Sequence, residues 1–182
     1  SKKLPGRSSL ELTAFEKNAL EKLCSLHKIS KVTFFQTCWS LFLSFWLDQS
    51  KVVSGLVYSG RNNLPDHLVN TFGFFINTLP LIITIEANKT FLELAKKVKE
   101  NIQRLKKYDL VSLAELNQIG SLKVSEHFDS VFTALNFPRP SLFTKTSLVD
   151  VEYEQTTQFP LTILFDPATM ELRLDFLEGY FS

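Results

Sequence analysis

The sequence has few of the residues that build metal centres, disulfide frameworks or acid–base sites. Its 182 residues include two cysteines, Cys24 and Cys38, and three histidines that lie far apart, at positions 27, 67 and 127. No CxxC pair and no metal-ligand spacing occurs among them, so we expect no metal site and no disulfide scaffold. The two thiols instead predict reduced, buried cysteines in a cytoplasmic protein.

An excess of charge and a long apolar run are also missing. The formal net charge is +1, which gives no broad basic surface for nucleic acid or an anionic membrane. The most apolar run, residues 32–47, is interrupted by Thr, Gln and Ser. It is also shorter than the roughly 20 residues that span a bilayer. We therefore expect no membrane span, and the start Ser-Lys-Lys-Leu-Pro indicates no signal peptide but a piece of a longer polypeptide.

What the sequence does contain is a large supply of apolar and aromatic side chains. Apolar residues make up 45% and charged residues 21%, which is typical of a globular domain with a core. Seventeen Phe and two Trp predict a bulky core, an apolar tunnel or a face that meets a partner.

Four capping-box patterns, each a Ser or Thr followed three residues later by Glu or Gln, predict helix starts at Thr13, Thr33, Thr90 and Ser112. The first helix extends to about residue 27 and the third to about residue 107. The helix after Thr33 has apolar side chains on nearly every face, so we expect it to be enclosed on most sides. Its Phe and Trp residues are interpreted as core rather than as a cofactor pocket.

Strands are predicted at residues 51–58, 74–85, 128–137, 161–165 and 171–177, the last two joined as a hairpin through residues 166–169. Apolar and charged residues alternate in the last strand, as in a half-buried strand. Residues 1–12 are interpreted as a linker or extended arm and residues 13–182 as one α/β unit, with helices packed on a mixed sheet.

Five short stretches, in a fixed order, carry a resemblance. They are residues 57–61 (VYSGR), 72–80 (FGFFINTLP), 108–116 (YDLVSLAEL), 128–138 (FDSVFTALNFP) and 154–162 (EQTTQFPLT). The chain resembles the condensation-domain family of nonribosomal peptide synthetases over roughly residues 10–182. The second stretch is the most specific, because Gly73, the Asn77-Thr78 pair and the following Leu-Pro must all fall at fixed spacing.

The resemblance implies a chloramphenicol acetyltransferase-like half-fold, and residues 13–182 would be the C-terminal subdomain of a condensation domain. The complete domain forms an amide bond between an acyl or peptidyl thioester and an aminoacyl acceptor, each carried on a carrier protein. Its active-site motif HHxxxDG belongs to the N-terminal half. No adjacent histidines occur here, so we expect no catalytic residue in this chain and no activity from it alone.

The resemblance also implies positions for site residues. Arg61, with Ser59 and Gly60, would form a supporting loop in which Arg61 pairs with the Asp of HHxxxDG in the other half; the alternative is a solvated loop arginine. Gly73, Asn77 and Thr78 would lie near the substrate tunnel, where Asn77 could bind a substrate amide or lock a bend between strands.

The implied partners are the N-terminal half of the condensation domain, peptidyl carrier proteins and an adjacent adenylation domain. No cofactor would be bound directly, because the substrates arrive on the phosphopantetheine of carrier proteins. The basic residues of the helix after Thr90 form a solvated face or, alternatively, a carrier docking surface. Two other functions stay open: a stand-alone carrier-binding or acyl-binding module, and an epimerisation-type or other acyltransferase of the same superfamily.

Overall fold

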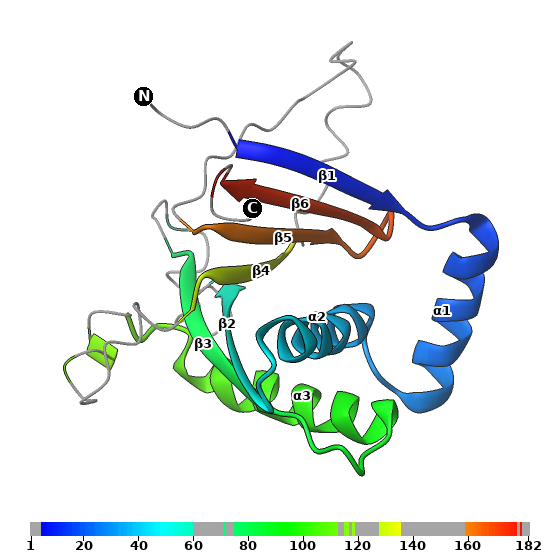
Figure 1. Cartoon of the computed structure of the whole chain (residues 1–182), viewed down its shortest axis with the longest axis horizontal. Coiled ribbons are helices and arrows are strands. Elements are labelled where there is room, and N and C mark those ends of the chain that lie inside the picture. The colour runs from blue at the N-terminus through cyan, green and yellow to red at the C-terminus, as the bar shows by residue number, and fades with distance from the viewer. Residues whose placement is uncertain are drawn as a thin grey trace.

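The computed structural model describes residues 5–59, 71, 75–112, 115, 116, 118, 128–135, 159–177 and 179. Its elements, in chain order, are β1 (Pro5–Glu11), α1 (Ala14–His27), α2 (Lys31–Leu47), β2 (Lys51–Tyr58), β3 (Asn77–Thr84), α3 (Phe91–Leu105), the short 3-10 helix η2 (Lys106–Tyr108), β4 (Ser130–Ala134), β5 (Leu161–Asp166) and β6 (Glu171–Leu177). Figure 1 shows a twisted sheet, with α2 and α3 below it and α1 at the right of the view. The predicted α/β class with a mixed sheet and packed helices is confirmed.

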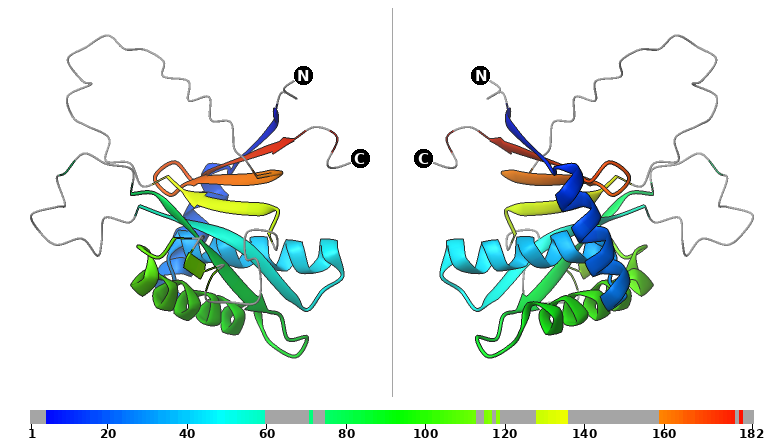
Figure 2. Two further views of the ribbon diagram at one scale, coloured as in Figure 1. Left: turned by 90° about the vertical axis from the view of Figure 1, so that its left-hand side faces the viewer. Right: turned by 90° about the vertical axis from the view of Figure 1, so that its right-hand side faces the viewer.

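The sheet combines parallel and antiparallel pairs in the order β1-β6-β5-β4-β2-β3. Strands β2, β4 and β5 are mutually parallel, whereas β3, β6 and β1 add antiparallel neighbours. The turned views in Figure 2 show the cyan α2 and the green α3 next to each other, below the yellow β4 and the orange β5. The core forms where α2 and α3 pack on the sheet, around buried residues that include Leu56, Val98, Phe132 and Phe165. The predicted hairpin of β5 and β6 is also confirmed.

The segment expected to be a linker or arm contributes β1, an edge strand antiparallel to β6. Two contacts hold it there. Gly6 leaves room for the ring of Phe176, since a Cβ at Gly6 would lie 2.4 Å from that ring. The Nε of Arg7 donates to Oδ1 of Asp175 at 3.2 Å. Most of β6 is half-buried, as its alternation predicts, but its one buried residue is Asp175, which is 3% exposed and also pairs with Arg173.

Helices α1 and α3 begin where the sequence predicts. The hydroxyl oxygens of Thr13 and Thr90 accept from the N–H of the third helical residue, and Glu16 and Glu93 accept in return from the cap N–H. These hydrogen bonds hold the pKa of both glutamates below the usual range. The same reciprocal pair forms between Ser112 and Glu115, so that predicted box is confirmed too.

The predicted start of α2 is wrong. Its cap is Ser30, whose hydroxyl accepts from the N–H of Thr33, so Thr33 lies within the helix and is not its cap. Gln36, the expected second half of a capping box, is fully buried and donates to Oγ of Ser54 on β2 at 3.2 Å. A side chain that reaches the sheet cannot fold back onto the helix end.

The expectation that α2 is enclosed on most sides holds for its first half, where Phe34, Phe35 and Trp39 pack against the core, and is wrong for its last turns. Its buried residues are mainly polar: Thr33, Gln36, Thr37, Ser40 and Leu43. Four aromatic and apolar side chains near its end are exposed, by 43% for Phe42, 87% for Phe45, 61% for Trp46 and 48% for Leu47. Small polar residues let α2 approach the sheet closely, and their hydroxyls are satisfied by the carbonyls of the helix itself.

Candidate functional site

Three of the six predicted site residues lie together where β2 ends and β3 begins. Tyr58 pairs with Asn77 and Val57 pairs with Thr78 in the antiparallel register, and the exposed Ser59 follows directly. The predicted Gly60, Arg61 and Gly73 lie outside the described residues. Their roles therefore stay predictions.

Asn77 fixes the main chain that follows α3. Its Nδ2 donates to the carbonyl oxygens of Asp109 (3.0 Å) and Val111, and its Oδ1 accepts from the N–H of Thr78. All the polar atoms of this side chain are thus used within the domain. This favours the interpretation of Asn77 as a structural lock over direct contact with substrate, although the lock joins β3 to the turn after η2 rather than bending two strands.

Tyr58 and Asp109 complete this cluster, and no sequence pattern indicates their roles. The phenol of Tyr58 donates to the carbonyl oxygen of Ile102 near the end of α3 at 3.0 Å. Burial, with a smaller contribution from the carboxylate of Asp109, raises the pKa of Tyr58. The side chain of Asp109 is 1% exposed. Asp109 lies within the YDLVSLAEL stretch. That motif identifies the segment, but it does not indicate that the segment is attached to Asn77 and β3.

Thr78 supports the opposite side of the same strands. A Cβ added at Gly55 would lie 2.8 Å from the Thr78 methyl group, 2.6 Å from the ring of Phe128 and 2.9 Å from Val131. Glycine is therefore required at position 55, because β2, β3 and β4 meet there at contact distance. In the described part of the chain, the contribution of Thr78 is the packing of its methyl group beside Gly55.

This edge of the sheet offers little for acid–base chemistry. Among the described residues, His27 lies in the last turn of α1, and the other two histidines are outside the described ranges. The described part of the chain contains no group of three or more potential metal ligands, and none of its helices is long and apolar enough to cross a membrane. This arrangement can hold the main chain of a neighbouring site in shape. Among the described residues, however, it supplies no nucleophile that is activated by a nearby base.

Exposed apolar side chains surround the Asn77 cluster. Ile76, Tyr108 and Leu110 are each more than half exposed. Ile76 precedes Asn77 in the sequence, and Tyr108 and Leu110 flank Asp109, whose carbonyl oxygen accepts from Asn77. The rigid cluster therefore carries an apolar rim.

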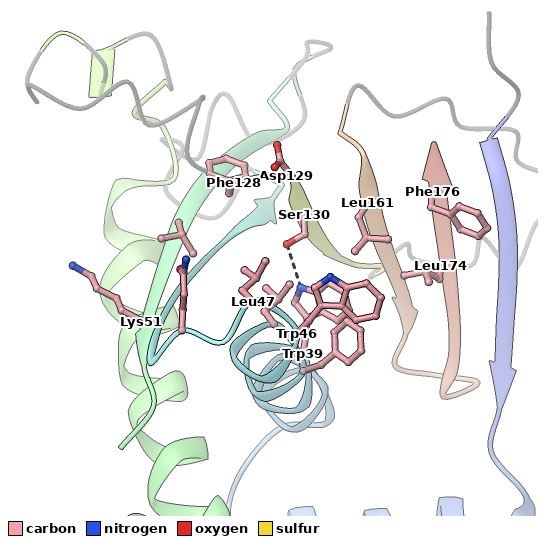
Figure 3. A pocket seen from close by; sticks show the side chains of 14 residues that line it. Trp39, Trp46, Leu47, Lys51, Phe128, Asp129, Ser130, Leu161, Leu174 and Phe176 are labelled. Carbon is pink, nitrogen blue, oxygen red and sulfur yellow. Dashed lines mark hydrogen bonds between the residues drawn. The ribbon is translucent and has the colours of Figure 1, made fainter. Parts of the chain in front are cut away.

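A second feature lies at the other end of β2, where Lys51 begins the strand. A groove of about 580 Å³ separates the end of α2 from the sheet. Figure 3 shows Trp39 and Trp46 of α2 on one side and Leu161, Leu174 and Phe176 of the sheet on the other. Trp39 is tied to the sheet by its Nε1, which donates to Oγ of Ser130 at 3.4 Å. By the rise per residue of a strand, Lys51 at one end of the groove is roughly 20 Å from Tyr58. Phe128, which also lines the groove, lies against Gly55, as Thr78 does.

The comparisons with known proteins agree with the motifs. The condensation-domain family model matches residues 2–182, so the chain belongs to the condensation-domain family. It is 29% identical over 175 residues to gramicidin S synthase 2 of Brevibacillus brevis, an alignment that covers 90% of this chain and 4% of that protein. It is 26% identical over 178 residues to nonribosomal peptide synthetase 5 of Aspergillus fumigatus, covering 96% of this chain and 8% of that one.

Solved structures show the same fold. The first condensation domain of the CDA synthetase matches with a TM-score of 0.71 at 18% identity, over 97% of this chain and 40% of that one. A four-domain nonribosomal peptide synthetase matches with a TM-score of 0.82 at 14% identity, over 98% of this chain and 15% of that one. The predicted acetyltransferase-like fold is thereby confirmed. The chain spans less than half the length of each of these proteins.

Proposed function

We propose that this chain is one half of a condensation domain and that the complete domain forms amide bonds in nonribosomal peptide synthesis. The observation that carries the proposal is the family match over residues 2–182. In the reaction, the amine of an aminoacyl acceptor attacks the carbonyl carbon of a thioester. A C–N bond forms, the C–S bond breaks, the donor thiol leaves and the amine loses a proton.

The chain would supply one wall of the reaction channel, and the N-terminal half would supply HHxxxDG. The apolar rim of Ile76, Tyr108 and Leu110 supports a partner surface beside the Asn77 cluster, because exposed apolar side chains gathered around a rigid site are typical of interfaces. The proposed role of Arg61 is to pair with the Asp of HHxxxDG. Breaking a buried pair of this kind typically costs about 3–5 kcal/mol.

The substrates would arrive on the phosphopantetheine arms of peptidyl carrier proteins, with an adenylation domain in the same polypeptide. The relatives named above are long proteins of which this chain matches less than a tenth, which is consistent with such a multidomain setting. A cytoplasmic location is part of the same proposal.

The test is reconstitution from two polypeptides. The 182-residue chain is mixed with the segment encoded immediately before it and with carriers loaded with a donor thioester and an acceptor amino acid. Mass spectrometry of the carriers then detects the product. We expect amide product from the mixture and none from either part alone. Product from the 182-residue chain alone, or none from a correctly folded mixture, would contradict the proposal.

Two matched variants test the role of Arg61 in this assay. Arg61→Ala should lower the rate of the mixture and weaken association of the two halves. Lys22→Ala, on α1, removes one positive charge from an exposed position away from the site and should leave both unchanged. Equal effects of the two variants would show that Arg61 is an ordinary surface arginine.

A further inference from the structure

The last cross-strand pair of β2 and β3 holds both the end of α3 and the turn that follows it. Tyr58 and Asn77 are partners in the antiparallel register of the two strands. The phenol of Tyr58 donates to the carbonyl oxygen of Ile102 at 3.0 Å. The Nδ2 of Asn77 donates to the carbonyl oxygens of Asp109 (3.0 Å) and Val111. Two neighbouring side chains therefore hold the chain on both sides of η2, and we call this arrangement the Tyr58–Asn77 clamp.

The hydroxyl of Tyr58 binds α3 at the place where the regular hydrogen bonding of that helix ends. The N–H of Lys106 is shared between the carbonyl oxygens of Ile102 and Arg104, and the chain continues as the 3-10 helix η2. Shared donors of this kind are common at helix ends. Since a carbonyl oxygen has two lone pairs, Ile102 can also accept from Tyr58. The clamp therefore holds the chain at the point where α3 changes into η2.

Stability alone is a weak reason for a tyrosine at position 58. The ring packs against the core, and a phenylalanine ring would fill the same space. An ordinary hydrogen bond adds little net stability, because the same groups bond to water in the unfolded chain. The raised pKa of Tyr58, caused mainly by burial, keeps the hydroxyl protonated at neutral pH, so it serves as a donor. What the hydroxyl adds is a fixed position of α3 relative to the end of β2.

Exposed residues lie directly beside the clamp. Ser59, one of the predicted site residues, follows Tyr58 and is exposed. Ile76, which precedes Asn77, is 52% exposed. A strand end that is bonded to a helix end cannot shift against it without breaking the bond. The positions of Ser59 and Ile76 therefore depend on the clamp.

We propose that Tyr58 is a positioning residue for the reaction of the complete domain. Together with Asn77 it fixes α3 and residues 109–111 against the ends of β2 and β3, and so sets the positions of Ser59 and Ile76. This inference rests on the proposed function, because the reaction is the one proposed above. A displacement of about 1 Å in a supporting element can lower a rate by about a hundredfold, so the loss of one hydroxyl should be measurable in the rate.

The test is Tyr58→Phe in the complete domain, which is this chain together with the segment that the proposed function places before it. We expect kcat for amide formation to fall about tenfold or more, with the KM for the loaded carriers within about twofold of its original value. The pH dependence of the rate should not change, since the buried phenol does not titrate near neutral pH. An unchanged kcat overturns the inference, and a shifted pH profile overturns it in favour of proton transfer by Tyr58.

A matched control separates positioning from stability. Thr37 on α2 is fully buried, and its hydroxyl donates to the carbonyl oxygen of Thr33 at 2.7 Å, which is the same kind of bond away from the clamp. Thr37→Val removes this hydroxyl and keeps the branched shape of the side chain. We expect it to lower the thermal midpoint at least as much as Tyr58→Phe does and to leave kcat unchanged. Equal losses of kcat in the two variants would assign the effect to stability and overturn the inference.

A double variant tests whether Tyr58 and Asn77 act as one unit. Asn77→Ala removes the other half of the clamp. The combined variant should lose less kcat than the product of the two single fold-losses, because either change already releases the same segment. Fold-losses that multiply would show that the two residues act separately, and would overturn the clamp.

Hydrogen exchange tests the clamp without any reaction. In Tyr58→Phe, the amides of residues 106–112 should exchange about tenfold faster, while those of residues 94–98 keep their rates. Unchanged rates in both segments overturn the clamp. Absence of product from the unaltered domain contradicts the proposed function instead, and the exchange rates then decide whether Tyr58 holds the end of α3.

Discussion

Helices α2 and α3 pack side by side on the same sheet but differ in the side chains that they bury most completely. Helix α3 buries Leu94, Ala95 and Val98 and exposes its charged residues, as its amphipathic pattern predicts. Helix α2 buries a mainly polar face and packs Phe34, Phe35 and Trp39 against the core at partial burial. Near its end it exposes Phe42, Phe45, Trp46 and Leu47. An apolar helix therefore does not necessarily bury its apolar residues along its whole length. Where the backbone must approach a sheet closely, small residues that bond to their own helix serve better than large apolar ones.

The largest expected effect is the difference in stability between a variant of an apolar residue on α3 and one on α2. Leu94→Ala on α3 should lower the free energy of unfolding by about 2–5 kcal/mol, because it leaves a cavity in the core. Phe45→Ala on α2 should change it by no more than about 0.5 kcal/mol, since Phe45 is largely exposed. Urea unfolding at low protein concentration, followed by circular dichroism, measures both. Comparable losses of unfolding free energy in the two variants would contradict this difference between α2 and α3.

The second prediction concerns the buried polar face of α2. Ser40→Leu adds apolar volume where the side chain is 1% exposed, so it should destabilise the fold by about 1–3 kcal/mol despite its greater hydrophobicity. Ser44→Leu, one turn later on the same helix and not among its buried residues, is the matched control. A stabilising Ser40→Leu would mean that the close approach of α2 to the sheet is not required.

The helix caps should differ in their response to pH. Glu93 in the α3 cap has a pKa lowered by its hydrogen bonds to the N–H and hydroxyl of Thr90. Its stabilisation is therefore complete above the unfolded pKa and is lost as the pH falls through the lower, folded value. The α2 cap, Ser30, has no acidic residue in its first turn.

Unfolding measured at neutral and acidic pH distinguishes the two caps. Glu93→Gln should destabilise at neutral pH, and its difference from the unmodified chain should vanish in acid. Ser30→Ala should cost about 1 kcal/mol at both pH values. A pH-dependent difference for Ser30→Ala, or a constant one for Glu93→Gln, would contradict this assignment.

The smallest expected effect is on the reactivity of Cys38, in the middle of α2. Burial raises the pKa of its thiol to about 11, so little thiolate is present at about pH 8 and alkylation should be slow. Cys38 also lines a hollow between α2 and β1. Alkylation rates of the folded and urea-unfolded chain check this, and equal rates would show that the α2 face is open to solvent at this position.

Local signals predict much of the fold. The capping boxes at Thr13, Thr90 and Ser112 depend on residues three apart, so they can be found in any sequence window. The strands β2, β5 and β6 and the hairpin between the last two follow from composition and turn residues. The candidate site could be predicted in part: Asn77, Thr78 and Ser59 lie together, but the motif does not indicate that Tyr58 and Asp109 hold the same cluster.

The sequence by itself determined the caps at Thr13, Thr90 and Ser112, most of the strand segments and the family, because each of these depends on residues close together or at fixed spacing. Only the tertiary structure decided which face of α2 is buried, how β1 joins the sheet and what Asn77 binds. Those features depend on contacts between residues distant in the chain, such as Gln36 with Ser54 and Asn77 with Asp109. No local pattern encodes such a contact, because its energy exists only once both elements are packed on the same sheet.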